Sequence, residues 1–585
     1  MWRYIVGLLA TLGGLALLAV LGIVALVTSG PFAGKSLPKQ MVLAVDLRNV
    51  PAESVSSDLL SGGLFRSQRD LTHVLETLWR AAEDPRVVGL FVDIGDEQAG
   101  LARVQELRQA LARVRGQGKF VIGFAESFGG SASHIADYYL ATALEQIWLQ
   151  PSGNFAVTGL AVETPFVRGG LDKLGVRIEG GKRMEYKSAP DSFTQTGLTG
   201  PGRENLQQLV DGLYGQFLFD AARDRHMEAD RLRALIDSAP LTAERALKEG
   251  LVDKLGYRSE ALDEMWRRAG TGPALISLND YAERGAPKPS GEIVALVRVS
   301  GPITSNPSPL GPLDSDAFAG ASDVVDNLLL AARTEGVRAI VLRIDSPGGT
   351  YPAADSLGAA VLRARKAGKP VIVSMGDVAA SGGYLAAVSA DVIVAEPTTI
   401  TGSIGVFGIY PVATELLESL GIKVERIGAG ANAGMYSMFH PPSEEQRALI
   451  ERELDIIYAD FTHKVGEARK LDAARLDAAA RGRVFTGAEA QRAGLVDELG
   501  GLSLAISIAR AKAGIPETRP VQVRRFPPDS DPLARLVERM LGSSTVQVQA
   551  PTIRAPRELR DALSRLGIVS RPGNARLPPL LPLWR

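Results

Sequence analysis

The two halves of the chain resemble each other, and this duplication limits the possible folds more than any other property of the sequence. The segment "VVGLFVDI" at 87–94 matches "VRAIVLRI" at 337–344, an offset of 250 residues that "GKFVI" at 118–122 and "GKPVI" at 368–372 share. Further along, "LTAERALKEGLVDKLG" at 241–256 matches "FTGAEAQRAGLVDELG" at 485–500 at an offset of 244. So small a drift predicts a duplicated domain with short insertions.

Within each half, the pattern is that of an α/β domain. Short β-branched runs bounded by glycine or proline alternate with amphipathic stretches such as "LARVQELRQALARVRGQG" at 101–118, which is typical of buried, mostly parallel strands covered by helices. We expect a first domain over 40–278, a polar linker over 279–291 and a second domain over 292–515. Residues 520–585 are rich in proline and arginine and predict a loosely ordered tail with one short helix near 532–541.

The N-terminus carries a hydrophobic segment. Residues 5–27 contain no charged side chain, and such a run is long enough to cross the hydrocarbon core of a bilayer. It is either an uncleaved anchor or a long signal peptide. Its length and the absence of a convincing A-x-A cleavage site before Lys35 favour an anchor within 1–30. Arg3 places the N-terminus in the cytoplasm and the bulk of the chain outside.

Composition excludes several kinds of chemistry. The chain has no cysteine, which rules out disulfides, thiolate metal sites and a cysteine nucleophile. Its 65 basic and 66 acidic side chains nearly balance, so no strong field favours nucleic acid. We expect no metal and no cofactor.

The halves differ at a few positions, and these differences point to specialised residues. Only the second half contains "DSPGG" at 345–349, "TGSIGVFG" at 401–408 and the paired glycines of "GDVAASGGYLAA" at 376–387. Ser131 stands opposite Ser381 but lacks those neighbours, so we interpret it as a remnant. Val157 stands opposite Ser403. Conversely, Lys187 of the first half has Ala433 opposite it, although Lys423 is kept on an apparent strand.

These pieces together favour nucleophilic catalysis. A serine hydroxyl needs a base, and none of the five histidines lies in a recognisable triad motif. A lysine that is shielded from water has a lowered pKa and can act as that base, which makes Lys187 the candidate partner of Ser381. Ser403 could hold its amine. The backbone amides of Gly348, Gly349 and Gly382 could stabilise an oxyanion.

Over roughly residues 1–515, the motifs "DSPGG", "GDVAASGGYLAA", "TGSIG" and "YKSA" resemble those of the signal peptide peptidase A family, also called protease IV, in its long, duplicated, membrane-anchored form. The resemblance implies tandem domains like those of Clp protease and the crotonases. It implies Ser381 as nucleophile, Lys187 as general base and Ser403 as the residue that orients the lysine. Gly348 or Gly349, with Gly382, would form the oxyanion hole.

The same resemblance implies a membrane-anchored serine endopeptidase that degrades signal peptides left in the bacterial inner membrane after secretion. The catalytic part would face the periplasmic side and assemble into a tetramer. Two alternatives stay open at this stage. A crotonase-type acyl-CoA enzyme would also use backbone amides but needs no serine, and an inactive membrane scaffold would need neither Ser381 nor Lys187.

Overall fold

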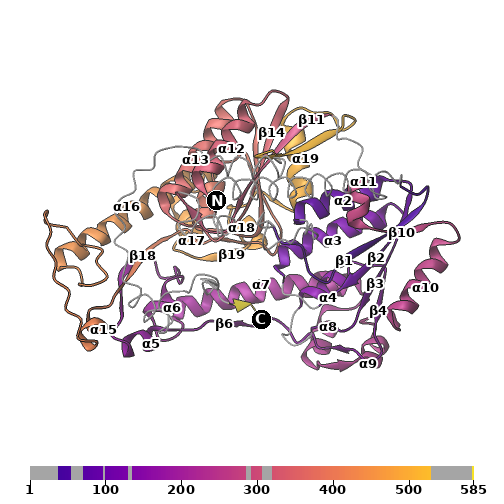
Figure 1. Ribbon diagram of the computed structural model, residues 1–585, viewed down its shortest axis with the longest axis horizontal. Coiled ribbons are helices and arrows are strands. Elements are labelled where there is room, and N and C mark those ends of the chain that lie inside the picture. The colour runs from indigo at the N-terminus through magenta and orange to yellow at the C-terminus, as the bar shows by residue number, and fades with distance from the viewer. Residues whose placement is uncertain are drawn as a thin grey trace, which may run out of the picture.

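The computed structural model describes residues 37–53, 70–95, 99–129, 135–284, 291–305, 319–528 and 583–584. In these residues two similar α/β units lie against each other, one formed by each half of the chain (Figure 1). The expected membrane span at 5–27, the expected tail helix at 532–541 and Ser131 lie outside the described residues. None of the helices that the structure describes combines the length and the apolar character required to cross a bilayer.

The first unit is built on a six-stranded parallel sheet in the order β10-β1-β2-β3-β4-β9. One face packs on α2, α3 and α4, and α10 contributes to the core on the other face. The bounds are β1 Met41–Leu47, α2 Leu71–Glu83, β2 Val87–Ile94, α3 Leu101–Gly116, β3 Phe120–Ala125, α4 Ala136–Ala141, β4 Gln146–Leu149, β9 Lys254–Leu255, α10 Arg258–Ala269 and β10 Ala274–Ser277.

The second unit repeats this arrangement. Its parallel strands run in the matching order β21-β11-β14-β15-β16-β20, with α12, α13 and α14 on one face and α19 on the other. The predicted duplicated α/β fold is therefore confirmed. The bounds are β11 Glu292–Ser300, α12 Ala321–Arg333, β14 Val337–Ser346, α13 Tyr351–Lys366, β15 Val371–Ala380, α14 Gly382–Ala387, β16 Val392–Ala395, β20 Glu498–Leu499, α19 Leu502–Lys512 and β21 Val521–Phe526.

The remaining elements are short strands, and helices that connect or flank the sheets. The strands are β5 Asn154–Phe155, β6 Val162–Glu163, β7 Arg177–Arg183, β8 Leu241–Thr242, β12 Ile303–Thr304, β13 Ala319–Gly320, β17 Ile400–Gly402, β18 Val406–Val412, β19 Val484–Thr486 and β22 Leu583–Trp584. The helices are α5 Arg168–Lys173, α6 Asp191–Thr194, α7 Gly200–Asp224, α8 Ala229–Asp237, α9 Ala243–Lys248, α11 Leu278–Arg284, α15 Thr414–Ser419, α16 Glu444–Arg469, α17 Ala473–Ala479 and α18 Gly487–Arg492.

Two expectations about the segments that flank the domains are wrong. The start of the expected linker forms α11, whose Tyr281 is buried in the first core and donates a hydrogen bond to Asp84. The tail does not become loose at 520, because β21 pairs along β11 and completes the second sheet as β10 completes the first. This strand is hard to recognise in the sequence, because the charged side chains of Arg524 and Arg525 interrupt its apolar pattern.

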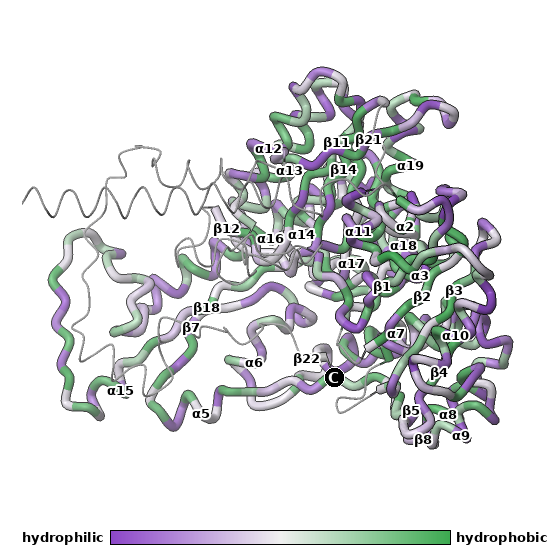
Figure 2. Tube along the Cα trace, turned by 45° about the vertical axis from the view of Figure 1, so that its right-hand side comes forward, coloured by the Kyte–Doolittle hydropathy of each residue, from purple (hydrophilic) through white to green (hydrophobic). Residues whose placement is uncertain are grey.

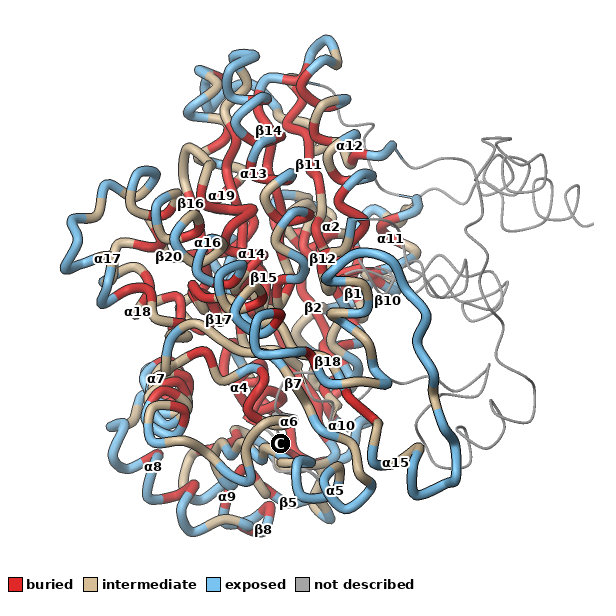
Figure 3. Tube along the Cα trace, turned by 90° about the vertical axis from the view of Figure 1, so that its left-hand side faces the viewer, coloured by how far each residue is buried: buried red, intermediate tan, exposed pale blue. Residues whose placement is uncertain are grey.

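An arm joins the two halves beside the main body. β7 of the first half pairs antiparallel with β18 of the second half along their whole length, and α5 and α15 lie near the far end of this ribbon (Figure 2). The arm is mostly exposed or half-buried, whereas the sheets contain the buried core (Figure 3). Residues 421–430, where Lys423 was expected on a strand, form no strand.

A cluster of buried charges joins the two halves. Arg343 of β14 is 1% exposed, and its guanidinium donates to both carboxylate oxygens of Glu53 at 2.8 and 2.9 Å and of Glu106 at 2.9 and 2.7 Å. Both glutamates belong to the first half. Removing one member of such a buried group leaves an uncompensated charge, so this cluster fixes how the halves pack.

Glu396 follows β16 and lies beside this buried cluster, but its own carboxylate is poorly compensated. It is fully buried, its Oε2 accepts from Gln109 at 3.0 Å, and among the described residues its Oε1 has no hydrogen-bond partner. Burial, followed by repulsion from Glu106, raises the pKa of Glu396 well above its ordinary value. The folded state therefore binds a proton at Glu396 more tightly than the unfolded state does. The resulting stabilisation of the folded state is complete at a pH below the unfolded pKa, and it is lost as the pH rises through the folded pKa.

Replacing Glu396 by glutamine should remove this cost while the side chain can still accept from Gln109. We expect the variant to be more stable than the wild type at pH 8, by about 1–3 kcal/mol, and the difference to shrink as pH falls towards 5. Urea unfolding at both pH values measures it. A variant that is less stable at pH 8 would show that the carboxylate is ionised and compensated.

Candidate active site

The second sheet extends further than the first at the point where the paired glycines occur. β15 has ten residues where its counterpart β3 has six, and its extension pairs with β17 from Val378 to Ala380. The register with β14 shifts between Ile344 and Ser346, so the strand is bulged there. Ser381 follows directly with φ 54° and ψ −118°, a rarely populated conformation for a residue with a side chain. Ser381 therefore lies at the turn between the end of β15 and the start of α14.

The structure brings Lys187 of the first half to this serine. The Lys187 Nζ atom lies 3.0 Å from Ser381 Oγ, 2.8 Å from the carbonyl oxygen of Ser403 and 2.9 Å from Ser403 Oγ. Its backbone passes so close to Gly482 of the second half that a Cβ there would lie 2.5 Å from the Lys187 amide nitrogen. The lysine is therefore enclosed by the half that provides the serine.

This enclosure changes the acid–base behaviour of the lysine. Lys187 is 2% exposed, and none of its three hydrogen-bond partners is a carboxylate. Desolvation lowers the pKa of Lys187 to about 7, because burial penalises the ammonium more than the neutral amine. Near neutral pH much of the lysine is therefore a free amine that can accept a proton from an adjacent hydroxyl.

Ser403 holds the amine through both its side chain and its backbone. It has φ 52°, and its N–H donates to the carbonyl of Arg483 at 2.7 Å, which fixes the turn after β17. The sequence indicated the hydroxyl contact but gave no sign of the carbonyl contact. With three partners around one nitrogen, the lysine side chain has little rotational freedom left.

The glycines of the predicted oxyanion hole are not equivalent. The Gly348 N–H donates to Ser346 Oγ at 3.1 Å, which leaves it unavailable to a substrate. The carbonyl of Gly348 and the N–H of Thr350 bond to Ile303 on β12, so the Gly349 amide between them faces the other way. Among the described residues the amides of Gly349 and Gly382 donate to no acceptor. This pair is the better candidate for two convergent donors.

The close packing here explains why side chains are absent. A Cβ on Gly348, whose φ is 105°, would lie 2.7 Å from the Gly382 nitrogen, and one on Gly349 would lie 1.9 Å from the carbonyl oxygen of Ile303. No side chain fits at either position without moving the backbone. The sequence DSPGG thus brings the two loops into contact beside Ser381.

The Ser403 hydroxyl is one of three partners of the amine, so its loss should have a moderate effect. We expect Ser403→Ala to lower kcat about tenfold, the equivalent of one hydrogen bond of about 1.4 kcal/mol, with KM unchanged because the carbonyl still holds the lysine. Steady-state kinetics on a peptide substrate measures this. A loss as large as that of Lys187→Met would show that the carbonyl alone cannot orient the amine.

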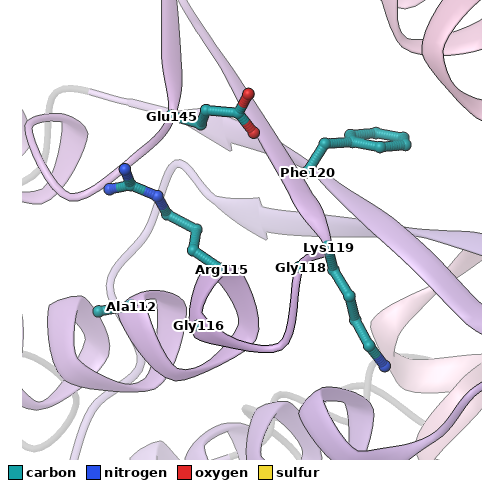
Figure 4. Close-up of a pocket in the computed structure, with 7 residues that line it drawn as sticks. All are labelled: Ala112, Arg115, Gly116, Gly118, Lys119, Phe120 and Glu145. Carbon is teal, nitrogen blue, oxygen red and sulfur yellow. The ribbon is translucent and has the colours of Figure 1, made fainter.

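A hollow of about 580 Å³ elsewhere on the first unit is a weaker candidate for a site. It lies where α3 ends and β3 begins, and Arg115, Lys119 and Glu145 line it (Figure 4). Arg115 donates to the carbonyl of Ala143, and Lys119 donates to the carbonyls of Ala81 and Asp84. Both cations therefore already donate to backbone carbonyls of neighbouring segments. The hollow is lined by no residue of the predicted site.

A duplicated α/β fold whose second half presents a serine at a strained strand-to-helix turn is a framework for a serine peptidase, and the chain is one. The model of peptidase family S49 matches residues 115–271 and 363–516, more than half of the chain. The chain therefore belongs to peptidase family S49, as its resemblance to the protease IV group predicted. Membership of this family supports the interpretation of the chain as a peptidase. It gives no support to the two alternatives, an acyl-CoA enzyme and an inactive scaffold.

Relatives extend this similarity over most of the chain. "Protease 4" of Salmonella typhi is 30% identical over 491 residues, which cover 80% of this chain and 77% of that protein. "Serine protease SPPA, chloroplastic" of Arabidopsis thaliana is 29% identical over 519 residues, covering 87% of this chain and 74% of that protein. "Putative signal peptide peptidase SppA" of Enterococcus faecium is 32% identical over 166 residues, covering 28% of this chain and 48% of that protein.

Proposed function

We propose that this peptidase cleaves peptide bonds through a Ser381–Lys187 dyad and that its substrates are signal peptides left in the membrane after secretion. The observation that carries the proposal is the 3.0 Å contact between Ser381 Oγ and a buried lysine amine with a pKa of about 7. An amine in this state can remove the hydroxyl proton during attack.

The steps follow from the atoms around the dyad. Ser381 Oγ attacks the scissile carbonyl carbon while Lys187 Nζ takes the hydroxyl proton, and the amides of Gly349 and Gly382 stabilise the resulting oxyanion. The intermediate collapses to an ester on Ser381, and Lys187 passes the proton to the leaving amine. Water then attacks the ester carbonyl while Lys187 takes one of its protons, and Lys187 returns that proton to the departing Ser381 Oγ as the second product is released.

The proposed location and substrate depend on the apolar segment 5–27. As an anchor it would hold the catalytic part at the outer face of the bacterial inner membrane, where cleaved signal peptides remain. Confinement of enzyme and substrate to one bilayer raises their encounter rate. The name of the Enterococcus faecium relative agrees with this substrate class. By analogy with the family we include a homotetramer in the proposal.

Degradation of a signal peptide in lipid vesicles tests this function. The full-length protein and a variant lacking residues 1–30 are compared on the vesicle-embedded peptide and on a soluble peptide of the same cleavage sequence. We expect equal activity on the soluble peptide and faster degradation of the embedded peptide by the anchored form. Suppose that the protein cleaves the soluble peptide but does not degrade the embedded signal peptide. The proposed dyad would then still stand, and the proposed substrate class would be refuted.

A further inference from the structure

A carboxylate of the second half caps a helix of the first half, four residues before the proposed nucleophile. Asp377 Oδ1 accepts a hydrogen bond from the backbone N–H of Arg103 at 2.9 Å, and Asp377 Oδ2 accepts from the Arg103 guanidinium. Arg103 is the third residue of α3, whose own N-cap, Gly100, provides no side-chain acceptor. Asp377 thus occupies the role that an N-cap side chain of α3 would normally have.

The fit between the two halves is close at this point. A Cβ on Gly100 would lie 1.9 Å from the Asp377 carboxylate, so the helix end contacts the carboxylate only because no side chain intervenes. The Asp377 and Arg103 side chains are 14% and 20% exposed, which shields their ion pair from most of the solvent. Such a pair is more orienting than a pair on the open surface.

A second carboxylate, from the neighbouring strand β14, contacts the same stretch of β15. Asp345 Oδ1 accepts from the Val378 N–H at 3.0 Å, and Gly376 packs against its carboxyl group. The next residue, Ser346, accepts the Gly348 N–H. Residues 376–378 therefore contact both Asp345 of β14 and helix α3 of the first half. Ser381 follows three residues after Val378.

The charged groups that act on Asp345 are Asp377, Glu53 of the first half and Arg103 of α3. Partial burial, followed by repulsion from Asp377 and Glu53, raises the pKa of Asp345 to about 7. Near neutral pH, Asp345 is thus partly protonated, which lessens its repulsion of Asp377.

We propose that Asp377 is a positioning residue, which acts by capping α3 so that the end of β15 keeps Ser381 within reach of Lys187. This inference rests on the proposed dyad. Because the two dyad residues belong to different halves, any contact that ties the strand of one to a helix of the other sets their separation. A displacement of about 1 Å at such a site can lower the rate about 100-fold.

The test uses the full-length protein with three variants. Asp377→Asn keeps an acceptor for the Arg103 N–H but removes the charge, and Asp377→Ala removes both. Asp455→Asn is the control, because it also deletes an ion pair between the halves, to Arg183 at 2.6 Å, but one whose carboxylate on α16 is exposed to solvent. Active-site titration with a fluorophosphonate normalises kcat to the folded fraction.

We expect wild-type kinetics for Asp455→Asn, about a fivefold loss of kcat for Asp377→Asn and about a 50-fold loss for Asp377→Ala, with KM nearly constant. The acid limb of the pH profile should move upward in the Asp377 variants, because a loosened junction admits water to Lys187. A purely structural role would lower the melting temperature without moving that limb.

Unchanged normalised kcat and an unchanged acid limb in Asp377→Asn would overturn the inference, and this holds even if Asp377→Ala does not fold. Failure of the proposed dyad gives a different result. In that case Ser381→Ala would still react with the fluorophosphonate, whatever the Asp377 variants do.

Discussion

Ser381→Ala should lower kcat/KM by at least about 10⁴-fold, since it removes the hydroxyl that forms the acyl-enzyme in the proposed mechanism. Alanine removes a single oxygen atom, so substrate binding and the oxyanion amides remain, and KM should change little. Hydrolysis of a fluorogenic peptide by the full-length protein measures the loss. The fluorophosphonate should label the wild type and leave the variant unlabelled.

The control for this variant is its thermal unfolding, because the backbone at position 381 is strained. Alanine adopts φ 54° no more easily than serine does, so the melting temperature should stay close to that of the wild type. Retained hydrolysis in a folded Ser381→Ala protein would show that the glycine-rich turn has only a structural role.

Removal of the amine should have an effect of similar size and a distinct pH signature. In the wild type we expect kcat/KM to fall about tenfold per pH unit below about 7, and to reach a plateau above it, because only the neutral amine of Lys187 accepts the serine proton. Lys187→Met should lose at least about 10³-fold at the plateau. The remaining activity should lack the limb near pH 7.

The stability of Lys187→Met separates catalysis from folding. Burial lowers the pKa of Lys187, so the unfolded state binds more protons between that value and its ordinary value, and the wild type gains stability as pH rises through this window. Methionine removes the cost. The variant should be at least as stable as the wild type at pH 7, and the difference should shrink towards pH 10. Full activity in Lys187→Met would assign the base to another residue.

Much of this architecture could be predicted, because duplication supplies an internal comparison. Repeats at offsets of 250 and 244 predicted two α/β units, and the units have matching strand orders. The asymmetry between Lys187 and Ala433, and between Ser403 and Val157, selected two residues of the site: Lys187 contacts Ser381, and Ser403 contacts Lys187. A difference between halves is informative because the fold itself does not require it.

What the sequence could not reveal depends on contacts between distant residues. Asp377 and Arg103 are 274 positions apart, and neither lies in a pattern that predicts a helix cap supplied by the other half. The choice between Gly348 and Gly349 depends on which amide Ser346 engages, which is a matter of backbone direction. β21 was missed because its pairing with β11 overrides the polar composition of Val521–Phe526.

The distribution of the two reactive groups along the chain has a consequence for biosynthesis. Lys187 and Ser381 are 194 positions apart, and the residues that hold the amine, the β18 partner of β7 and Gly482 come later still. A nascent chain that has completed only its first half therefore carries the proposed base without the proposed nucleophile and without the residues that enclose the lysine. On the proposed assignment, proteolytic competence arises only once translation is nearly finished, so order of synthesis protects the cell in the way a removable propeptide protects it elsewhere.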